Sequence, residues 1–216
     1  LKEKRLSLED VPDCWLAFKR DKVKIQRFAP IKPLMRVLGY YLAEGYARKS
    51  DSVYQISFSI ADEEVRNDLK KALREAFGNG FGIYERGEKV TVGSRVLYLL
   101  FTEALKAGTN AHTKRVPSIV YTLPKDAVAE MLRAYFEGDG SALKTVPRRV
   151  AYSINKILLE DIETLLLSKF GIRGYYTVDK NANRGNARGR LYHIERGNEV
   201  PVSRVYALNI ASEHYH

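Results

Sequence analysis

Two stretches of the chain decide its fold: Val37-Leu-Gly-Tyr-Tyr-Leu-Ala-Glu44-Gly45 and Leu132-Arg-Ala-Tyr-Phe-Glu-Gly-Asp139-Gly140. Each is a mainly apolar run with helical spacing that ends in an acid followed by a glycine. A glycine directly after a helix is typical of the left-handed C-terminal cap, so both glycines are predicted to end helices. Both carboxylates would then lie at the negative end of a helix dipole, which costs about 0.3–1 kcal/mol. Because an acid occupies this unfavourable position in both stretches, the two acids indicate function more than folding.

The repetition extends beyond these two helices. Asp139 follows Glu44 by 95 residues, and the helix end Phe170-Gly171 follows Phe77-Gly78 by 93. The first copy reads as a helix opened by Pro33, a strand at 53–59, a helix at 62–77, a hairpin at 81–93 and a short helix at 95–107. The second reads as a helix from Pro124 to Gly140, a strand at 150–154, a helix at 157–170 and strands at 172–179, 190–195 and 204–210.

This order predicts an α+β fold of two αββαββα-type halves with antiparallel sheets and an internal pseudo-twofold axis. We divide the chain into an N-terminal extension (1–30), a first half (31–120) and a second half (121–216). Small residues four apart, Gly39 with Ala43 and Ala134 with Gly138, let helix backbones approach closely. The two signature helices are therefore predicted to pack together, which would bring Glu44 and Asp139 side by side.

Composition narrows the class of protein. Lys and Arg number 36 against 26 Asp and Glu, a net charge of +10, which favours a nucleic-acid partner. No apolar run approaches the roughly 18 residues of a membrane span, and no signal peptide opens the chain, so we expect a cytoplasmic protein. Cys14 is the only cysteine, which excludes an internal disulfide and a cysteine metal site.

Two adjacent carboxylates repel each other unless a proton or a cation lies between them. Carboxylate oxygens are hard ligands that suit Mg²⁺, which keeps several waters and needs few protein ligands. In a basic protein, such a pair indicates phosphodiester hydrolysis, with metal ions that activate water and stabilise the leaving oxygen. Ser and Cys nucleophile signatures are absent, and His112 and His193 lack a partner at metal-ligand spacing.

Val37–Gly45 and Leu132–Gly140 resemble the two signature helices of the LAGLIDADG homing endonucleases, and the acid before the last glycine matches in both. The resemblance runs from about residue 31 onward and includes the loop Lys114-Arg-Val-Pro117, 25 positions before the second acid. It is closest to the single-chain, intein-encoded members, in which a lysine at that place assists catalysis. It implies catalytic Glu44, Asp139 and Lys114, and Mg²⁺ (or Mn²⁺) at Glu44 and Asp139 with Gly45 and Gly140.

The resemblance also implies a staggered double-strand break in a long DNA target, which is asymmetric because the two halves differ. In the family each half lays a curved sheet into the major groove, so we expect a monomer with internal pseudo-twofold symmetry, bound to double-stranded DNA. The family pattern also has a lysine in the second half, after its last strand. The candidates here are Lys144 and Lys156, and both match that position poorly. The self-splicing blocks of an intein are not visible, so both an intein and an intron origin stay open.

Phosphate binding needs Lys and Arg, and base reading needs polar side chains projecting from a sheet. Within the strand at 53–59, alternation places Gln55, Ser57 and Ser59 on one face, which is the better reader of a groove. The residues predicted to contact DNA are Arg48, Lys49, Gln55, Ser57, Arg86, Lys89, Lys144, Arg148, Arg149, Tyr152, Tyr175, Lys180, Arg184, Arg188 and Arg190.

Two other functions remain open at this point. The same fold serves RNA-binding intron maturases, which bind structured RNA without cutting DNA. A catalytically silent DNA-binding regulator is the other alternative, although such relatives usually lose the acids, and both acids are present here.

Overall fold

The computed structural model describes residues 28–142, 148–179, 192–195, 198–201 and 205–211, together with two short strands, β1 (Trp15–Leu16) and β2 (Ile25–Gln26). Side chains are described for residues 25, 28–138, 150–178 and 205–210. In this part of the chain no helix is long and apolar enough to cross a membrane.

The first half begins with α1 (Ile31–Glu44), β3 (Gly45–Ser50), β4 (Val53–Ser59) and α2 (Glu63–Phe77). It continues with β5 (Ile83–Arg86), β6 (Lys89–Gly93), α3 (Arg95–Leu99) and the π-helical turn η2 (Leu100–Ala104). The strands form an antiparallel sheet in the order β3-β4-β6-β5. The strand at 53–59, the hairpin and the following helices are as predicted, whereas α1 begins two residues before Pro33.

The second half repeats this plan. A 3₁₀ turn, η3 (Ser118–Thr122), leads to α4 (Lys125–Asp139), β7 (Gly140–Ala142), β8 (Arg148–Ser153), α5 (Lys156–Leu165) and the π-helical turn η4 (Leu166–Phe170). The chain then forms β9 (Gly174–Asp179), the hairpin β10 (Tyr192–Glu195) with β11 (Asn198–Pro201), and β12 (Val205–Ala211). The second sheet has the order β7-β8-β12-β9, which matches the first sheet strand for strand.

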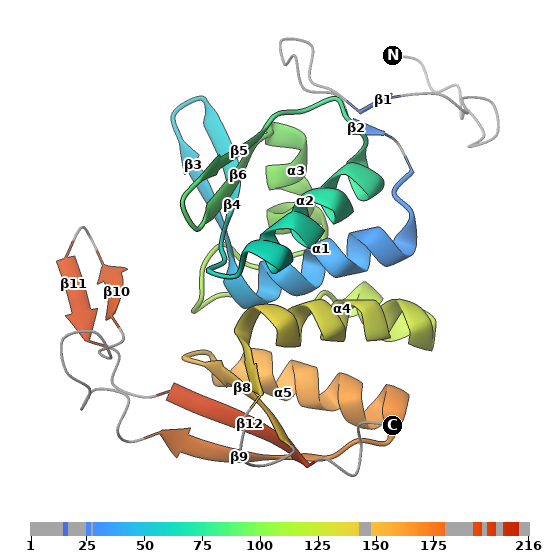
Figure 1. Ribbon diagram of the computed structural model, residues 1–216, viewed down its shortest axis with the longest axis vertical. Coiled ribbons are helices and arrows are strands. Elements are labelled where there is room, and N and C mark those ends of the chain that lie inside the picture. The colour runs from blue at the N-terminus through green and yellow to red at the C-terminus, as the bar shows by residue number, and fades with distance from the viewer. Residues whose placement is uncertain are drawn as a thin grey trace.

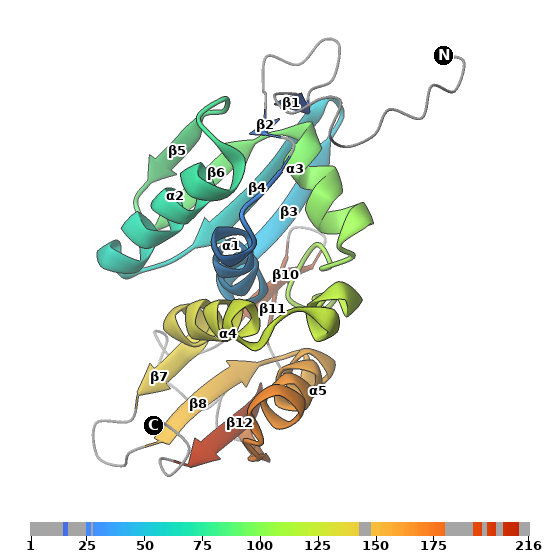
Figure 2. The same ribbon diagram turned by 90° about the vertical axis from the view of Figure 1, so that its right-hand side faces the viewer.

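The helices α1 and α4 pack against each other at the centre of the molecule, between the two sheets (Figures 1 and 2). A Cβ added to Gly39 would collide with the carbonyl oxygen of Met131 and lie 2.8 Å from the Cβ of Ala134. A Cβ added to Gly138 would lie 2.8 Å from the Cβ of Ala43. The small residues therefore set the close approach of the two helices, which confirms the predicted helix pair.

Charged side chains and a tyrosine also cross this seam. Arg36 of α1 donates to Glu130 of α4 at 3.1 and 3.0 Å and to Asp68 of α2 at 3.1 Å. The hydroxyl of Tyr40 lies 2.9 Å from a carboxylate oxygen of Asp68 and 2.8 Å from one of Glu137. These contacts tie α1, α2 and α4 into one unit, so the two halves are held in a fixed relation.

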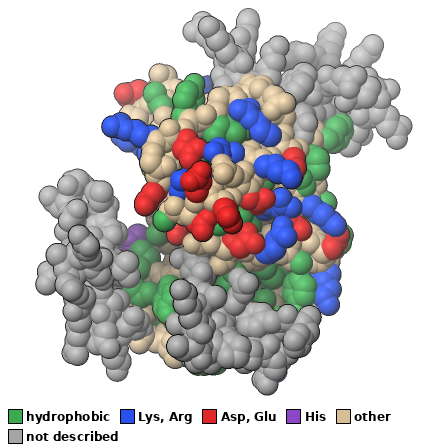
Figure 3. All heavy atoms as spheres, viewed as in Figure 1, with side chains coloured by type: hydrophobic (Ala, Val, Ile, Leu, Met, Phe, Trp, Pro, Cys, Tyr) green, Lys and Arg blue, Asp and Glu red, His purple; other side chains and the backbone are tan. Residues whose placement is uncertain are grey.

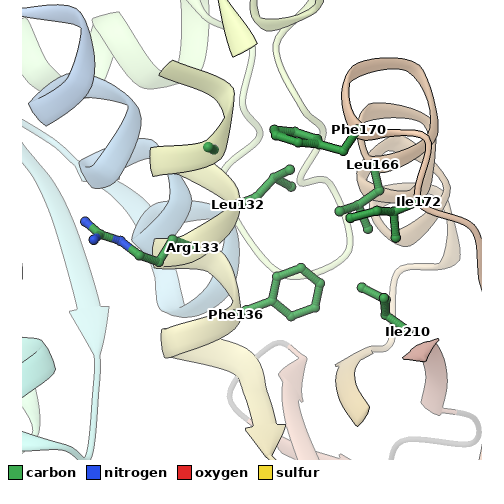
Figure 4. Close-up of a pocket in the computed structure, with 8 residues that line it drawn as sticks. Leu132, Arg133, Phe136, Leu166, Phe170, Ile172 and Ile210 are labelled. Carbon is green, nitrogen blue, oxygen red and sulfur yellow. The ribbon is translucent and has the colours of Figure 1, made fainter. Parts of the chain in front are cut away.

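The two halves differ in how the outer side of the central helix is covered. In the first half Tyr41 of α1 packs against Phe101 of η2, with ring centroids 4.6 Å apart. Its counterpart in α4 is Phe136, which lines a pocket of about 220 Å³ between α4, η4 and β12 (Figure 4). The pocket is lined by Ala129, Leu132, Arg133, Phe136, Leu166, Phe170, Ile172 and Ile210.

Candidate active site and nucleic-acid interface

Glu44 is the last residue of α1, and Gly45 is the first residue of β3. Gly45 has φ −84° and ψ 158°, which is extended backbone, so the prediction of a left-handed cap at this position is wrong. The glycine is needed for space instead, because a Cβ there would lie 2.6 Å from the backbone of Tyr41. Gly140 likewise begins a strand, β7, directly after α4. The helix passes straight into the sheet, which fixes the acid where the two meet.

Lys114 lies in the segment that joins the two halves and is almost fully buried, with 4% of its surface exposed. Its Nζ donates a hydrogen bond of 2.7 Å to the carbonyl oxygen of Ala43, the residue before Glu44. The last carbonyls of a helix lack partners within the helix and carry its partial negative charge. The ammonium group therefore stabilises the end of α1 on which Glu44 lies.

Burial raises the pKa of Glu44 above its usual value, and the charge of Lys114 opposes this shift without cancelling it. Desolvation disfavours the charged form of a carboxyl group, so Glu44 is a carboxylate whose charge is incompletely compensated within the protein. Such a group is a good ligand for a cation.

Asp139 is the last residue of α4 and occupies the same position in the second half as Glu44 in the first. Gly138, just before it, faces Ala43 and lies against Glu44, since a Cβ there would be 3.6 Å from Glu44 Cγ. Both helices run in the same direction in Figure 1, so their acid ends lie at one end of the seam. The side chain of Asp139 lies outside the described residues, and the pairing of the two carboxylates stays a prediction.

Within the described side chains, no cluster of three or more His, Cys, Asp or Glu residues forms a metal site. A magnesium site at Glu44 and Asp139, with Gly45 and Gly140, therefore also stays a prediction. His112 is exposed in the segment between the halves, and the side chain of His193 is not among those described. Lys156 begins α5 and pairs with Glu160 at 2.6 Å.

The face of the first sheet that carries no helices holds most of the DNA contacts predicted in the first half. Directly paired residues on neighbouring strands point to the same face. The register pairs Arg48 with Gln55 and Arg86 with Lys89, while Lys89 also pairs with Ser59. All four predicted contacts, Arg48, Gln55, Arg86 and Lys89, therefore share one face. Arg48, Arg86 and Lys89 are exposed there.

Two other predicted contacts in this half are placed differently. Lys49 pairs with Tyr54, and its Nζ lies 5.6 Å from the centre of the Tyr54 ring, on the face covered by α3. Ser57 lies on the open face but is only 1% exposed, and its Oγ is 3.0 Å from the hydroxyl of Thr91. Neither side chain is presented to a ligand on the open face in this structure.

Cross-strand register also places Tyr46 and Thr91 on this face, beside Ser57. The Nζ of Lys89 lies 5.3 Å from the centre of the Tyr46 ring. Sequence reasoning missed both residues, because the alternation of one strand does not reveal which residues of its neighbours lie beside it.

In the second half, the sheet register pairs Tyr152 with Ala207 and Tyr175 with Asn209. Ala207 and Asn209 lie two positions apart in β12, so the two tyrosines share one face of the sheet. Asp179 pairs with Val205 at the end of the same strand pair. Tyr175 is 51% exposed, whereas Asn209 is buried and donates to the hydroxyl of Thr177 at 3.1 Å. Arg148 and Arg149 begin β8, with side chains outside the described set. The predicted contacts Lys144, Lys180, Arg184, Arg188 and Arg190 also lie outside the described residues.

Charge is distributed unevenly over the molecule. In the view of Figure 3, acidic side chains gather across the middle of the molecule, over the helices of the seam. Among the acids of these helices and of α2, Asp68 and Glu130 pair with Arg36, and Glu137 lies beside Arg133. On the first sheet, Arg48, Arg86 and Lys89 are exposed cations.

The fold and the site together define a two-half α+β protein whose central helix pair ends in acids beside a buried lysine. The family model described as a LAGLIDADG-like domain matches residues 32–107 and 126–212. The chain therefore belongs to the LAGLIDADG-like domain family.

Two solved homing endonucleases have similar folds. Mesophilic variants of the homing endonuclease I-DmoI are 18% identical with a TM-score of 0.51, over 85% of this chain and 84% of theirs. The homing endonuclease I-WcaI bound to its DNA recognition sequence is 14% identical with a TM-score of 0.52, over 87% of this chain and 79% of its own. At these identities the likeness concerns the fold.

A much closer relative is the DNA polymerase II large subunit of Thermococcus kodakarensis, which is 79% identical over 216 residues. The match covers all of this chain and only 12% of that relative. The chain therefore spans only a small part of the length of this relative.

Proposed function

We propose that this protein is a site-specific DNA endonuclease of the homing type, which makes a staggered double-strand break by metal-dependent phosphodiester hydrolysis. The observation that carries the proposal is the end of the α1–α4 seam. There Glu44 and the position of Asp139 end neighbouring helices, and the Lys114 ammonium lies 2.7 Å from the carbonyl of Ala43.

The donor set fits a hard divalent cation. Glu44 is a partly buried carboxylate with a raised pKa, and Asp139 ends the neighbouring helix. We propose that these two acids hold Mg²⁺, or Mn²⁺ in its place, with Gly45 and Gly140 beside them. Bound there, the cation would lower the pKa of a water molecule and offset negative charge on the phosphate. Lys114 would stabilise the negative charge that develops on the reacting phosphate.

Binding to double-stranded DNA is proposed to use the open faces of the two sheets. In the first half, Arg48, Arg86 and Lys89 supply positive charge, and Gln55 supplies an amide that reads base edges. In the second half, Tyr152 and Tyr175 lie on the corresponding face. Because the two faces carry different side chains, the DNA target is expected to be long and asymmetric.

We also propose that the two strands are cut at unequal rates by a monomer. Glu44 and Asp139 differ by one methylene group, and the Lys114 ammonium donates to the carbonyl of Ala43, directly before Glu44. The identity of 79% to a segment that is 12% of a longer protein favours an origin inside a host polypeptide, as in an intein.

The test is cleavage of a supercoiled plasmid that carries the uninterrupted insertion site, in buffer with Mg²⁺ and in buffer with EDTA. Wild-type protein is expected to give linear DNA with Mg²⁺ alone, and nicked DNA is expected to accumulate on the way. Asp139→Asn and Glu44→Gln should each lower double-strand cutting by about 100-fold or more. Undiminished cutting by the Asp139→Asn protein would contradict the assigned roles.

A further inference from the structure

Lys114 belongs to the segment between the halves, yet helix α5 of the second half holds it. The side chain of Asn155 donates from Nδ2 to the carbonyl oxygen of Lys114 at 2.8 Å. Its Oδ1 accepts from the amide of Leu158 at 3.2 Å and so caps α5. Asn155 is buried, with 7% of its surface exposed. One amide group thus ends a helix and fixes the backbone of the lysine.

Asp161, six residues after Asn155 in α5, binds the two residues that follow Lys114. Its carboxylate accepts two hydrogen bonds from the Arg115 guanidinium, at 2.7 and 3.0 Å, and one from the amide of Val116 at 3.0 Å. The Asp161 side chain is 12% exposed and the Arg115 side chain is 53% exposed, so a largely buried carboxylate accepts charge-assisted bonds from a guanidinium at the surface. Lys114 and its two successors are therefore each bonded to α5.

Comparison with the first half shows that this arrangement is specific to α5. The counterpart of Asn155 is Asp62, which caps α2 by accepting from the amides of Glu64 and Val65. The counterpart of Asp161 is Asp68, which contacts Arg36 and Tyr40 of α1. A carboxylate caps a helix as well as an amide does, but it cannot donate to a carbonyl. The asparagine at 155 thus provides a donor that capping alone does not require.

We infer that Asn155 and Asp161 are positioning residues that set Lys114 against the end of α1, so that the second half assembles the lysine site of the first. This inference rests on the proposed function, because the catalytic role of Lys114 is itself proposed. We call Asn155 and Asp161 the clamp. Loosening the clamp should affect the cutting of one DNA strand only, because it removes one lysine from one of two cutting sites and leaves the acids in place.

The test compares Asn155→Asp and Asp161→Asn with the matched control Asp62→Asn. Asn155→Asp keeps the cap acceptor and removes the donor to Lys114, whereas Asp62→Asn changes a cap that does not touch the segment. Acetylation of Lys114 by acetic anhydride, followed by peptide mass spectrometry, reports how well the amine is held without requiring activity. We expect acetylation to be about two- to tenfold faster in Asn155→Asp and about ten- to hundredfold faster in Asp161→Asn, and unchanged in the control.

The second readout is the rate of cutting of each strand, measured on an end-labelled duplex of the insertion site with Mg²⁺. Both clamp variants should slow one strand by about the same factors and so accumulate nicked DNA, as Lys114→Met should do more strongly. A loss of overall stability would slow both strands equally. Wild-type acetylation of Lys114 in both Asn155→Asp and Asp161→Asn would overturn the inference, and so would an unchanged ratio of strand rates in these two variants where Lys114→Met does change that ratio. If Lys114→Met cuts both strands at wild-type rates, the proposed role of Lys114 fails, and acetylation still decides whether α5 holds it.

Discussion

At the scale of single residues, Glu44 carries a conflict between stability and chemistry. It ends α1, where the helix dipole disfavours a negative charge, and burial raises its pKa above the usual value. Lys114 relieves part of this cost by its hydrogen bond to the carbonyl of Ala43. A strongly perturbed, partly buried carboxylate is typical of a site where its charge serves a ligand or a reaction.

Glu44→Gln is therefore expected to stabilise the protein at pH 7 by about 0.3–1 kcal/mol while it lowers double-strand cutting by about 100-fold or more. A carboxyl group with a raised pKa in the folded state loses stability as pH rises from its ordinary value, 4.5, through the raised one. Below both values the group is neutral in the folded and unfolded states. Thermal unfolding at pH 7 and pH 3 should show a gain at pH 7 that disappears at pH 3, and a gain of equal size at both would contradict the explanation.

At the scale of elements, local patterns predicted most helices and strands. The strand at 53–59 and the helix ends at Phe77 and Phe170 follow from alternation and from glycine caps, and Gly171 is indeed left-handed with φ 72°. Gly45 was predicted wrongly because its role depends on the space left by Tyr41 in the folded chain. The short strand β7 was missed because Gly140–Ala142 is too brief to show a period.

The closeness of α1 and α4 gives a prediction for Gly39. Gly39→Ala should destabilise the protein by about 1–3 kcal/mol, although alanine favours a helix, because its Cβ would collide with the backbone of Met131. The matched control is Gly93→Ala in β6, where nothing lies within 4 Å of an added Cβ and the change should stay within about 0.5 kcal/mol. Urea unfolding of both variants checks this, and equal stabilities would argue against a backbone contact at the seam.

A second prediction concerns the contact between α2 and β5. Arg66 and Lys70 bind the carboxylate of Glu85 at 2.9 and 2.6 Å, and their hydrogen bonds lower its pKa. A lowered pKa in the folded state stabilises the protein above the ordinary value, 4.5, and this stability is lost as pH falls through the lowered value. Glu85→Gln should therefore lower the melting temperature at pH 7 by a small amount, because the pair is near the surface.

The matching control is the same pair of proteins in acid. At pH 2 the wild-type and Glu85→Gln proteins should melt closer together than at pH 7, because protonation has already removed the ion pair from the wild type. A constant difference in melting temperature across this range would show that Glu85 acts through packing.

At the scale of the whole molecule, sequence reasoning correctly predicted two similar halves around one helix pair. The contacts of Lys114 with Asn155, and of Arg115 and Val116 with Asp161, could not be predicted from the sequence, because they link residues 41 to 46 positions apart and follow no period. The differences between the halves were equally hidden. Equivalent positions such as Asp68 and Asp161 keep the same residue but hold different segments, and only the folded chain shows which.

The placement of charge over the molecule leads to a prediction for DNA binding. Arg48 and Arg86 are exposed on the open face of the first sheet, whereas Lys49, next to Arg48, lies over the Tyr54 ring on the helix-bearing face. Each phosphate contact releases about one counterion, so its loss reduces the slope of log K against log salt concentration by about one. Arg48→Ala and Arg86→Ala should each show this reduction in titrations of insertion-site DNA between low and moderate salt.

Lys49→Ala is the matched control. It removes the same charge from the chain but should leave the slope nearly unchanged. If Lys49→Ala reduced the slope as much as Arg48→Ala, the DNA would contact the protein elsewhere than on the open face, or net charge alone would govern binding.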